Sequence, residues 1–218
     1  KSFSRETGLK YIICNADEGE PGNFKDRYLM EKDPHQIIEG MLISAYATKA
    51  SKGFIYIRGE YNKSIDIMRK TIDEARSNGY LGENILGSDF SFELEIRRGA
   101  GAYVCGEEFA LIESIEGKPG RTRVKPPYPS EKGVYDLPTL INNVETFCNL
   151  PFILRIGGQE YSKIGSNYAS GTKLISLSGN VINKGLFEVP FGRTIREVIE
   201  VLGEGVPKNR ELKMVQLG

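Results

Sequence analysis

Apolar and polar residues follow two different periods along the first half of the chain. Short apolar or alternating runs at 11–14, 53–59 and 90–96 have the length and composition of strands. Between them, apolar residues recur every three or four positions over 33–46 and 65–79, which predicts two amphipathic helices. Strands that alternate with helices in this way predict an α/β fold with a mostly parallel sheet.

Capping residues mark where several helices begin. Asp33 followed by Pro34 provides an N-cap and a proline at the first helical position. Asn142, with Glu145 three residues later, predicts a capping pair at the start of a further apolar helix. A glycine-rich stretch within 99–115 leads into another helix. In parallel sheets ligands bind beyond the carboxyl ends of the strands, and this stretch follows such an end.

The pattern changes after the polar residues near 168. A β-hairpin, a short helix and a third strand are predicted there, at 173–179 with 186–189, at 195–202 and at 212–217. This order is typical of a small α+β domain. We therefore expect two domains, one α/β domain over residues 1–168 and one α+β domain over residues 169–218.

Charge and cysteine content exclude several classes of protein. The 29 basic and 29 acidic residues leave no net charge, and no basic patch points to nucleic acid. No apolar run approaches the ~20 residues of a membrane span. Three widely spaced cysteines indicate a reducing compartment and fit neither a disulfide framework nor a cysteine-held zinc or iron–sulfur site. With His35 as the single histidine, a His-dependent hydrolase or metal site is not expected.

The polar loop at 15–22, directly after the first predicted strand, is the strongest candidate site. It holds three carboxylates, on Asp17, Glu18 and Glu20, beside the amide of Asn15. Carboxylates this close raise one another's pKa and are costly to bury without partners. A ligand rich in hydroxyl groups, such as a ribityl or ribose chain, is favoured. A divalent metal and a solvated turn without a ligand stay open, although the spacing lacks the ligand ladder of a calcium loop.

The glycine stretch is the second candidate. Gly99, Gly101 and Gly106 let the backbone approach a ligand closely, and a helix follows. The spacing departs from the G-x-G-x-x-G pattern of dinucleotide folds. Glu107 and Glu108 would repel a phosphate at this helix start, but they suit the helix dipole. The stretch therefore fits either a ligand site or a helix stabilised by acidic residues in its first turn.

A basic, proline-rich segment at 121–129 is the third candidate. Its lysine, Lys125, could clamp the phosphates of a dinucleotide while Tyr128 stacks on a ring. The alternative is a surface linker without a ligand. The surrounding residues 117–139 contain five prolines, and a loop of this length in a compact domain is typically functional or a linker.

Four of these motifs occur together, in this order and spacing, in one protein family. They are NADEGEPG, GAYVCGEE, KPPYP and NNVET, at 15–22, 101–108, 125–129 and 142–146. The chain resembles the flavoprotein subunit that accepts NADH in respiratory complex I, and its relatives in NAD(P)-linked hydrogenases and formate dehydrogenases. From about Lys173 it is similar to the soluble-ligand-binding β-grasp domain of that family.

The resemblance implies a Rossmann-like FMN-binding domain with a mostly parallel sheet, followed by a truncated β-grasp domain. It assigns FMN contacts to eight residues: Asn15, Asp17, Glu18, Tyr103, Gly106, Glu107, Asn142 and Asn143. It assigns NADH contacts to four: Glu20, Glu108, Lys125 and Tyr128. Tyr128 stands where many relatives have phenylalanine. Hydride transfer between the two cofactors needs no acid or base from the protein.

The resemblance also implies the setting of the whole protein. NAD(P)H would be the substrate, FMN the resident cofactor, and a [4Fe–4S] cluster would bind cysteines outside these residues. The partners would be other redox subunits, among them a thioredoxin-like [2Fe–2S] subunit, in the cytoplasm or peripheral on the inner face of a membrane. The family's phosphate-binding glycine loop is also absent here, so we expect this chain alone to bind FMN weakly or not at all and to be inactive. The electron acceptor and the choice between NADH and NADPH stay open. An alternative of another class is a non-catalytic module that binds partners through the β-grasp segment.

Overall fold

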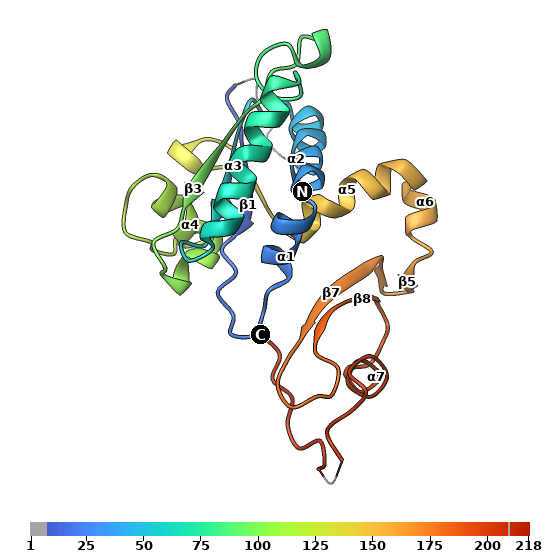
Figure 1. Ribbon diagram of the computed structural model, residues 1–218. Helices are drawn as coiled ribbons and strands as arrows, with labels where there is room; N and C mark the ends of the chain where they lie inside the picture. The colour runs from blue at the N-terminus through green and yellow to red at the C-terminus, as the bar shows by residue number, and fades with distance from the viewer. Residues whose placement is uncertain (1–7, 209) are drawn as a thin grey trace. The chain divides into compact units, whose positions relative to one another are not determined.

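The computed structural model describes residues 8–208 and 210–218, and the chain forms two compact units (Figure 1). One unit comprises the described residues up to Gly19 together with Asp26–Pro151, and the other comprises Glu20–Lys25 with Phe152–Gly218. The domain boundary expected between residues 168 and 169 stays a prediction.

A four-stranded parallel sheet is the framework of the first unit. Its strands are β1 (Tyr11–Ala16), β2 (Lys52–Ile57), β3 (Glu93–Arg98) and β4 (Thr139–Asn143). They lie in the order β3-β2-β1-β4, and every neighbouring pair is parallel. The predicted α/β fold with a parallel sheet is therefore confirmed.

Helices connect these strands, and one more helix, α5, follows the last of them. They are α1 (Lys25–Lys32), α2 (Pro34–Thr48), α3 (Asn62–Ser77), α4 (Glu108–Ile115) and α5 (Val144–Ile156). Short 3₁₀ turns lie at Ile85–Gly87 (η1), Tyr103–Gly106 (η2) and Val134–Asp136 (η3). Among the described residues, no helix combines the length and the apolar character needed to cross a membrane.

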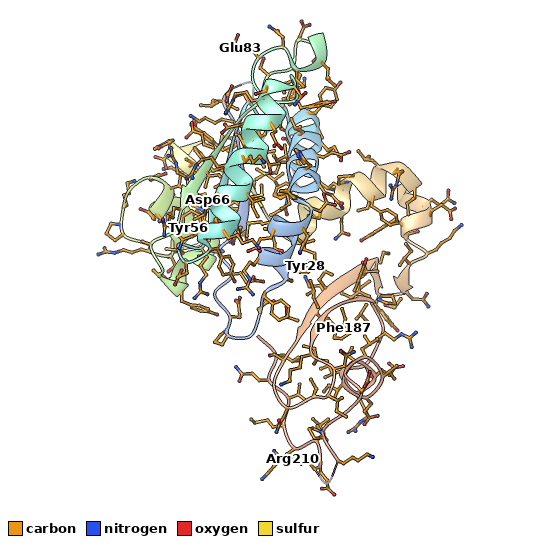
Figure 2. The ribbon with its side chains drawn as sticks, in the orientation of Figure 1. Tyr28, Tyr56, Asp66, Glu83, Phe187 and Arg210 are labelled. Carbon is orange, nitrogen blue, oxygen red and sulfur yellow. The ribbon has the colours of Figure 1, made fainter. Side chains whose placement is uncertain are left out.

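Alternate residues of β1 feed two separate hydrophobic cores, as the period of a strand requires. Ile12 points into the larger core, which also contains Met41 of α2 and Phe147 of α5. Ile13 points into the second core, which contains Phe109 of α4. Side chains fill the space between the strands and the helices (Figure 2). Buried thiols also lie in these cores, none in a disulfide: Cys14, Cys105 and Cys148.

The structure of the first unit differs from the prediction in three details. The helix begins after Asp33 and with Pro34 as expected, but no side-chain hydrogen bond from Asp33 caps it. At the start of α5, Asn143 rather than Asn142 accepts the hydrogen bond from the Glu145 backbone. The strand expected from residue 90 begins at Glu93, because Phe92 pairs instead with Gly82 in an isolated antiparallel bridge.

The second unit contains mostly short elements. They are α6 (Gly158–Tyr161), β5 (Gly165–Ser166), β6 (Ala169–Ser170), β7 (Thr172–Leu177), β8 (Gly185–Pro190), α7 (Ile195–Glu197) and a π turn at Val198–Leu202. Strands β7 and β8 form the predicted antiparallel hairpin. The predicted short helix begins in a capping box, where Thr194 and Glu197 exchange hydrogen bonds between side chain and backbone.

The third strand predicted at 212–217 is wrong. The described residues 210–218 form no strand, and their side chains are exposed, with Met214 at 83% and Leu217 at 71%. Strand structure requires a neighbouring strand that pairs with its backbone N–H and C=O groups. No neighbouring strand within the described chain pairs with these residues, so their apolar content alone does not make them a strand.

Candidate functional site

The carboxyl ends of the four parallel strands bring separate parts of the sequence to one edge of the sheet. Asp17 follows β1, Arg58 follows β2 and Gly99 follows β3, while Asn143 ends β4. In register, Asn15 pairs with Asn143 although 128 residues separate them. This is the edge at which open parallel sheets bind ligands.

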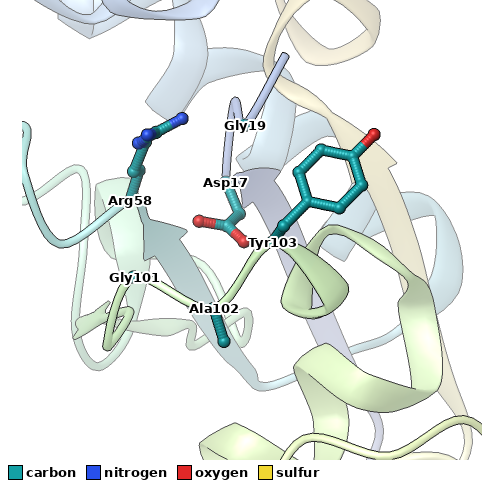
Figure 3. Close-up of a pocket in the computed structure, with 6 residues that line it drawn as sticks. All are labelled: Asp17, Gly19, Arg58, Gly101, Ala102 and Tyr103. Carbon is teal, nitrogen blue, oxygen red and sulfur yellow. The ribbon is translucent and has the colours of Figure 1, made fainter. Parts of the chain in front are cut away.

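A small pocket lies at this edge (Figure 3). It is lined by Asp17, Gly19, Arg58, Gly101, Ala102 and Tyr103. The ring of Tyr103 lies against Gly19, where a Cβ atom would come within 2.7 Å of the ring. The cavity volume is about 40 Å³, far below the roughly 300–1,000 Å³ of typical small-molecule sites. The pocket therefore accommodates only part of a ligand as large as a nucleotide.

Two amide side chains connect the elements around the pocket. Asn15 donates from Nδ2 to the carbonyl of Gly106 at 2.9 Å, which ties β1 to the η2 turn that carries Tyr103. Asn143 donates from Nδ2 to the carbonyl of Asn15 at 3.1 Å and to Asp26 Oδ2 at 2.7 Å. Both residues therefore have a structural role at the predicted FMN site. Asn142 is half-buried beside them, paired in register with Cys14 of β1.

Glu18 lies inside the unit rather than in the lining of the pocket, and its side chain is engaged with neighbouring groups. The residue is only 3% exposed. Its carboxylate accepts hydrogen bonds from the backbone N–H groups of Asp26 and Arg27, at the start of α1, and from the Tyr61 hydroxyl at 3.0 Å. Burial, and then the Asp26 charge, raise the pKa of Glu18 above its ordinary value. The assignment of Glu18 to FMN stays a prediction.

We expect Glu18 to give the protein a characteristic pH dependence. Its pKa is higher in the folded than in the unfolded state, so the folded state binds more protons between the two values. Glu18 therefore makes the free energy of unfolding fall as pH rises from about 4.3 to the raised pKa, by at most about 1.4 kcal/mol per pH unit. Glu18→Gln should remove this component, as urea denaturation from pH 4 to pH 8 would reveal. Parallel pH profiles for the two proteins would contradict the expectation.

The acidic start of α4 binds the basic loop through Lys125. Glu107 caps the helix by accepting hydrogen bonds from the N–H groups of Phe109 and Ala110, at 2.9 and 3.1 Å. Lys125 Nζ lies 3.1 Å from the Glu107 carboxylate and 2.5 Å from that of Glu108. The hydrogen bond to Glu108, above all, raises the pKa of Lys125. Three of the predicted cofactor residues thus form one cluster.

The cluster around Lys125 does not include two of the residues predicted to bind NADH, Tyr128 and Glu20. Tyr128 is 43% exposed, and its backbone N–H donates to Glu131 at 3.0 Å. Glu20 belongs to the segment that groups with the second unit, where its carbonyl accepts a hydrogen bond from Asn23. The assignment of both residues to NADH stays a prediction.

Arg58 is a pocket residue that the sequence reasoning missed. It donates from Nη1 to the carbonyl of Glu18 at 2.6 Å, and from Nε to Glu60 at 3.2 Å. Its position in the sequence is a signal for a site residue, because Arg58 directly follows the apolar strand β2, as the acidic loop directly follows the apolar strand β1. Arg58 thus places a positive charge in a pocket that also contains Asp17.

The metal alternative for the acidic loop gains no support. Across residues 8–208 and 210–218, no group of three or more His, Cys, Asp or Glu side chains is arranged to hold a metal ion. Asp17 instead lines the pocket, and the Glu18 carboxylate accepts hydrogen bonds from α1 and Tyr61.

Comparisons with known proteins match this geometry to a family. Residues 1–152 match the family model described as the Nuo51 FMN-binding domain. The chain is 53% identical to a subunit of the NADH-quinone oxidoreductase of Aquifex aeolicus, over 97% of this chain and 50% of that protein. It is 50% identical to the HndC subunit of the NADP-reducing hydrogenase of Solidesulfovibrio fructosivorans, over 100% of this chain and 44% of that protein. The chain spans about half the length of these curated relatives.

A solved structure is also similar. The crystal structure of NAD⁺-reducing [NiFe]-hydrogenase in the H₂-reduced state superposes with a TM-score of 0.83 and 41% sequence identity. The match covers 91% of this chain and 33% of the hydrogenase chain.

Proposed function

The chain belongs to the family of the Nuo51 FMN-binding domain, and from this premise we propose that the whole protein is the electron-input subunit of an NAD(P)H-oxidising complex. FMN, when bound, accepts a hydride from the reduced nicotinamide and releases the two electrons one at a time. The observation that carries the proposal is the pocket at the carboxyl edge of the sheet, where Asp17, Arg58 and Tyr103 meet a glycine-rich backbone.

The residues of this pocket fit a flavin nucleotide. Asp17 offers carboxylate oxygens that accept hydrogen bonds from the hydroxyl groups of a ribityl chain. Tyr103 is 69% exposed and presents an aromatic face. Gly19 and Gly101 line the pocket and carry no side chain to hold a ligand away from the backbone. The half-buried amides of Asn15 and Asn143 keep these elements in register without lining the pocket.

The basic loop and the start of α4 would bind the dinucleotide. Lys125 offers a positive charge for its phosphates, and Tyr128 a ring for stacking. Glu108 offers carboxylate oxygens for ribose hydroxyl groups. In this proposal the protein aligns the nicotinamide with the flavin and contributes no proton to the transfer.

The remaining partners of the whole protein follow from the same premise. Electrons would pass to a [4Fe–4S] cluster in the same protein and to other subunits, including a thioredoxin-like [2Fe–2S] subunit. The complex would be cytoplasmic or peripheral on the inner face of a membrane, with quinone as the acceptor. The hydrogenase relative and the similar hydrogenase structure support a second candidate, an NAD(P)-linked hydrogenase, to which the family resemblance adds formate dehydrogenases.

The substitution Asp17→Asn tests the flavin site. Hydrogen bonds to charged groups contribute about 1.5–3 kcal/mol, so we expect FMN to bind roughly ten- to a hundredfold more weakly to the full-length variant. Flavin fluorescence during titration of the apoprotein gives the dissociation constant. Asp66→Asn is the matched control, because Asp66 lies on α3 with its side chain 74% exposed and pairs with Arg69 one turn away on the same helix (Figure 2). Equal FMN affinity in the two variants would count against the site.

Assays of the native complex separate the candidate functions. Reduction of a quinone analogue by NADH supports the complex I type, while reduction of NAD⁺ or NADP⁺ by H₂ or formate supports the second candidate. The full-length protein could also bind no FMN and oxidise neither NADH nor NADPH. That result would favour the non-catalytic partner-binding module.

A further inference from the structure

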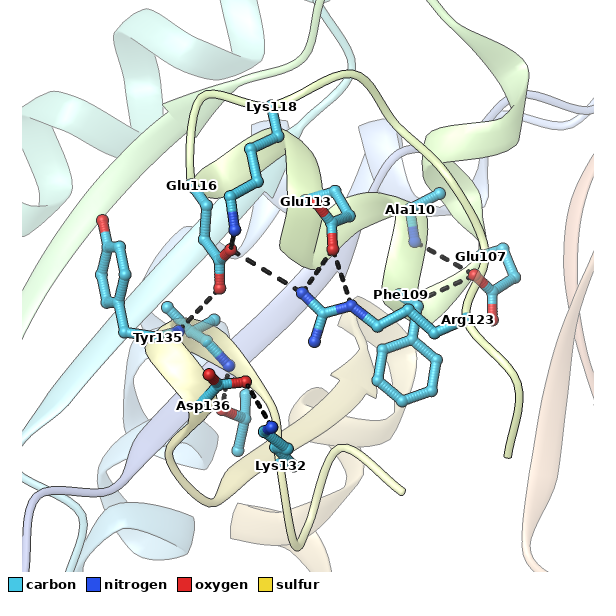
Figure 4. Close-up of polar contacts among 12 residues, drawn as sticks. Glu107, Phe109, Ala110, Glu113, Glu116, Lys118, Arg123, Lys132, Tyr135 and Asp136 are labelled. Atoms are coloured by element: carbon cyan, nitrogen blue, oxygen red, sulfur yellow. Dashed lines mark hydrogen bonds and ion pairs between the residues drawn. The ribbon is translucent and has the colours of Figure 1, made fainter. Parts of the chain in front are cut away.

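An arginine of the basic loop is bound to the side of α4, away from the pocket. Arg123 donates from Nε to Glu113 at 2.6 Å, and its Nη2 lies 2.5 Å from the same carboxylate oxygen. Nη2 also lies 3.7 Å from Glu116. These side chains are largely buried, at 27%, 16% and 4% exposed (Figure 4). Arg123 is thus held by two carboxylates that are shielded from water.

Glu116 connects Arg123 to both ends of the longer proline-rich loop at 117–139. Its carboxylate pairs with Lys118 at 2.6 Å, near the beginning of the loop, and accepts a hydrogen bond from the Tyr135 N–H at 2.7 Å, near its end (Figure 4). A carboxylate that is 4% exposed needs such partners to offset the loss of hydration. The acidic side of α4 therefore fixes the path of the loop at three points.

The segment that follows Arg123 leads from this attachment to the residues predicted to bind the dinucleotide. Arg123 and Lys125 both lie over the ring of Phe109, at 5.3 and 5.5 Å from its centroid, whereas Val124 between them is 86% exposed. Lys125 thereby reaches Glu108 at the start of α4.

A second attachment lies beyond Tyr128. The carbonyl of Pro129 accepts a hydrogen bond from the N–H of Thr139, the first residue of β4, at 2.8 Å. Gly133 packs against the side chain of Thr139 too closely for a Cβ atom, which would lie 2.2 Å from its Oγ1. Tyr128 thus lies between a segment held on α4 and a segment held on the sheet.

We propose that Arg123 is a positioning residue for dinucleotide binding, because its bonds to Glu113 and Glu116 hold the segment that presents Lys125 and Tyr128. This inference rests on the proposed function, since it takes NADH as the ligand of that segment. Arg123 itself touches α4 and not the pocket lining. Its loss should therefore weaken NADH binding without changing hydride transfer or the flavin site.

Steady-state kinetics of the full-length protein, with ferricyanide as electron acceptor, test the assignment. For Arg123→Met we expect the KM for NADH to rise about tenfold, with kcat within about twofold of the wild type and the FMN content unchanged. Arg123→Lys keeps a positive charge near Glu113 and should raise the KM only about two- to threefold. Rescue by lysine distinguishes a positioning charge from a side chain that merely fills space.

Two further variants make the test specific. Val124→Ala changes the exposed neighbour on the same segment and should leave both KM and kcat unchanged. Glu113→Gln should raise the KM, and combining it with Arg123→Met should add little, because both changes remove the same interaction. Absorbance of bound flavin and a thermal melt accompany each variant.

Three outcomes would overturn the assignment. The first is an unchanged KM for NADH in Arg123→Met. The second is a joint loss of FMN and kcat with a lowered melting temperature in that variant. The third is an equal rise in KM in Arg123→Met and Arg123→Lys. A wild-type protein that binds FMN but shows no NADH oxidation would instead overturn the proposed function, and this assignment with it. The two failures are distinguishable because the second appears before any substitution is made.

Discussion

Replacing Gly40 with alanine is expected to destabilise the first unit by about 3 kcal/mol or more. Gly40 lies within α2, where a Cβ atom would come 2.0 Å from the carbonyl oxygen of Phe147 in α5. The contact is with backbone, so no side-chain rotation relieves it. The hydrogen bond from Gln36 of α2 to the carbonyl of Cys148, at 2.6 Å, holds the two helices at this short distance.

Helix propensity alone predicts the opposite effect of this substitution on stability. Alanine is favoured over glycine in a helix interior by about 1 kcal/mol, so the sequence predicts that Gly40→Ala stabilises the protein. Urea denaturation followed by circular dichroism decides between the two signs. Gly158→Ala is the matched control, because Gly158 begins α6 and a Cβ atom there has nothing within 4 Å. A Gly40→Ala variant as stable as the control would show that the helices can separate at little cost.

Replacing Asn143 with aspartate is expected to have the largest effect on the site. The Asn143 amide donates to Asp26 Oδ2 at 2.7 Å and to the carbonyl of Asn15. In Asn143→Asp a carboxylate would face the carboxylate of Asp26, a residue only 3% exposed. Two lost hydrogen bonds and a repelling charge together should cost roughly 3 kcal/mol of stability at pH 7, and FMN retention with it.

The loss of stability in Asn143→Asp should depend on pH, and the direction of this dependence identifies its cause. Two adjacent carboxylates raise one another's pKa in the folded state, so the folded variant binds more protons than the unfolded variant. Its free energy of unfolding should therefore rise as pH falls from 7 to 5, relative to the wild type. Denaturation curves and bound-flavin absorbance at both pH values measure this.

Asn62→Asp is the matched control for that substitution. Asn62 is exposed at the first position of α3, and its Oδ1 accepts a hydrogen bond from Arg98 at 2.8 Å. A negative charge there meets a guanidinium and the positive end of the helix dipole, so the change should be neutral or slightly stabilising. If Asn143→Asp loses stability equally at pH 5 and pH 7, repulsion from Asp26 is not the cause.

Much of the fold was predictable because its signals are local. The apolar run before Asn15 and the glycine-flanked run that begins at Gly53 are strands, and the helices between them follow the period of their apolar residues. The β7–β8 hairpin was predictable for the same reason. The prediction is wrong where strand pairing decides the structure, since residues 212–217 are largely apolar but have no partner strand within the described chain.

The candidate site was predictable only in part. Strand ends pointed to Asp17 and to the glycine loop, and family resemblance added Tyr103 and Asn143. Arg58 belongs to no motif, and its place directly after an apolar strand is the one signal that points to it. A dense acidic run does not show which carboxylate lines a pocket, as Asp17 does, and which accepts hydrogen bonds from a helix start, as Glu18 does.

The sequence by itself determined most of the strands and helices, although not β4 or α1, and it determined which loops carry the unusual chemistry, because these signals depend on neighbouring residues. Tertiary structure alone decided that β4 pairs with β1, which places Asn143 beside Asn15, and that Lys125 meets Glu107 and Glu108. These contacts join residues far apart in the chain. Their partners depend on which strands pair and which helix faces pack, and no local period of the sequence specifies that choice.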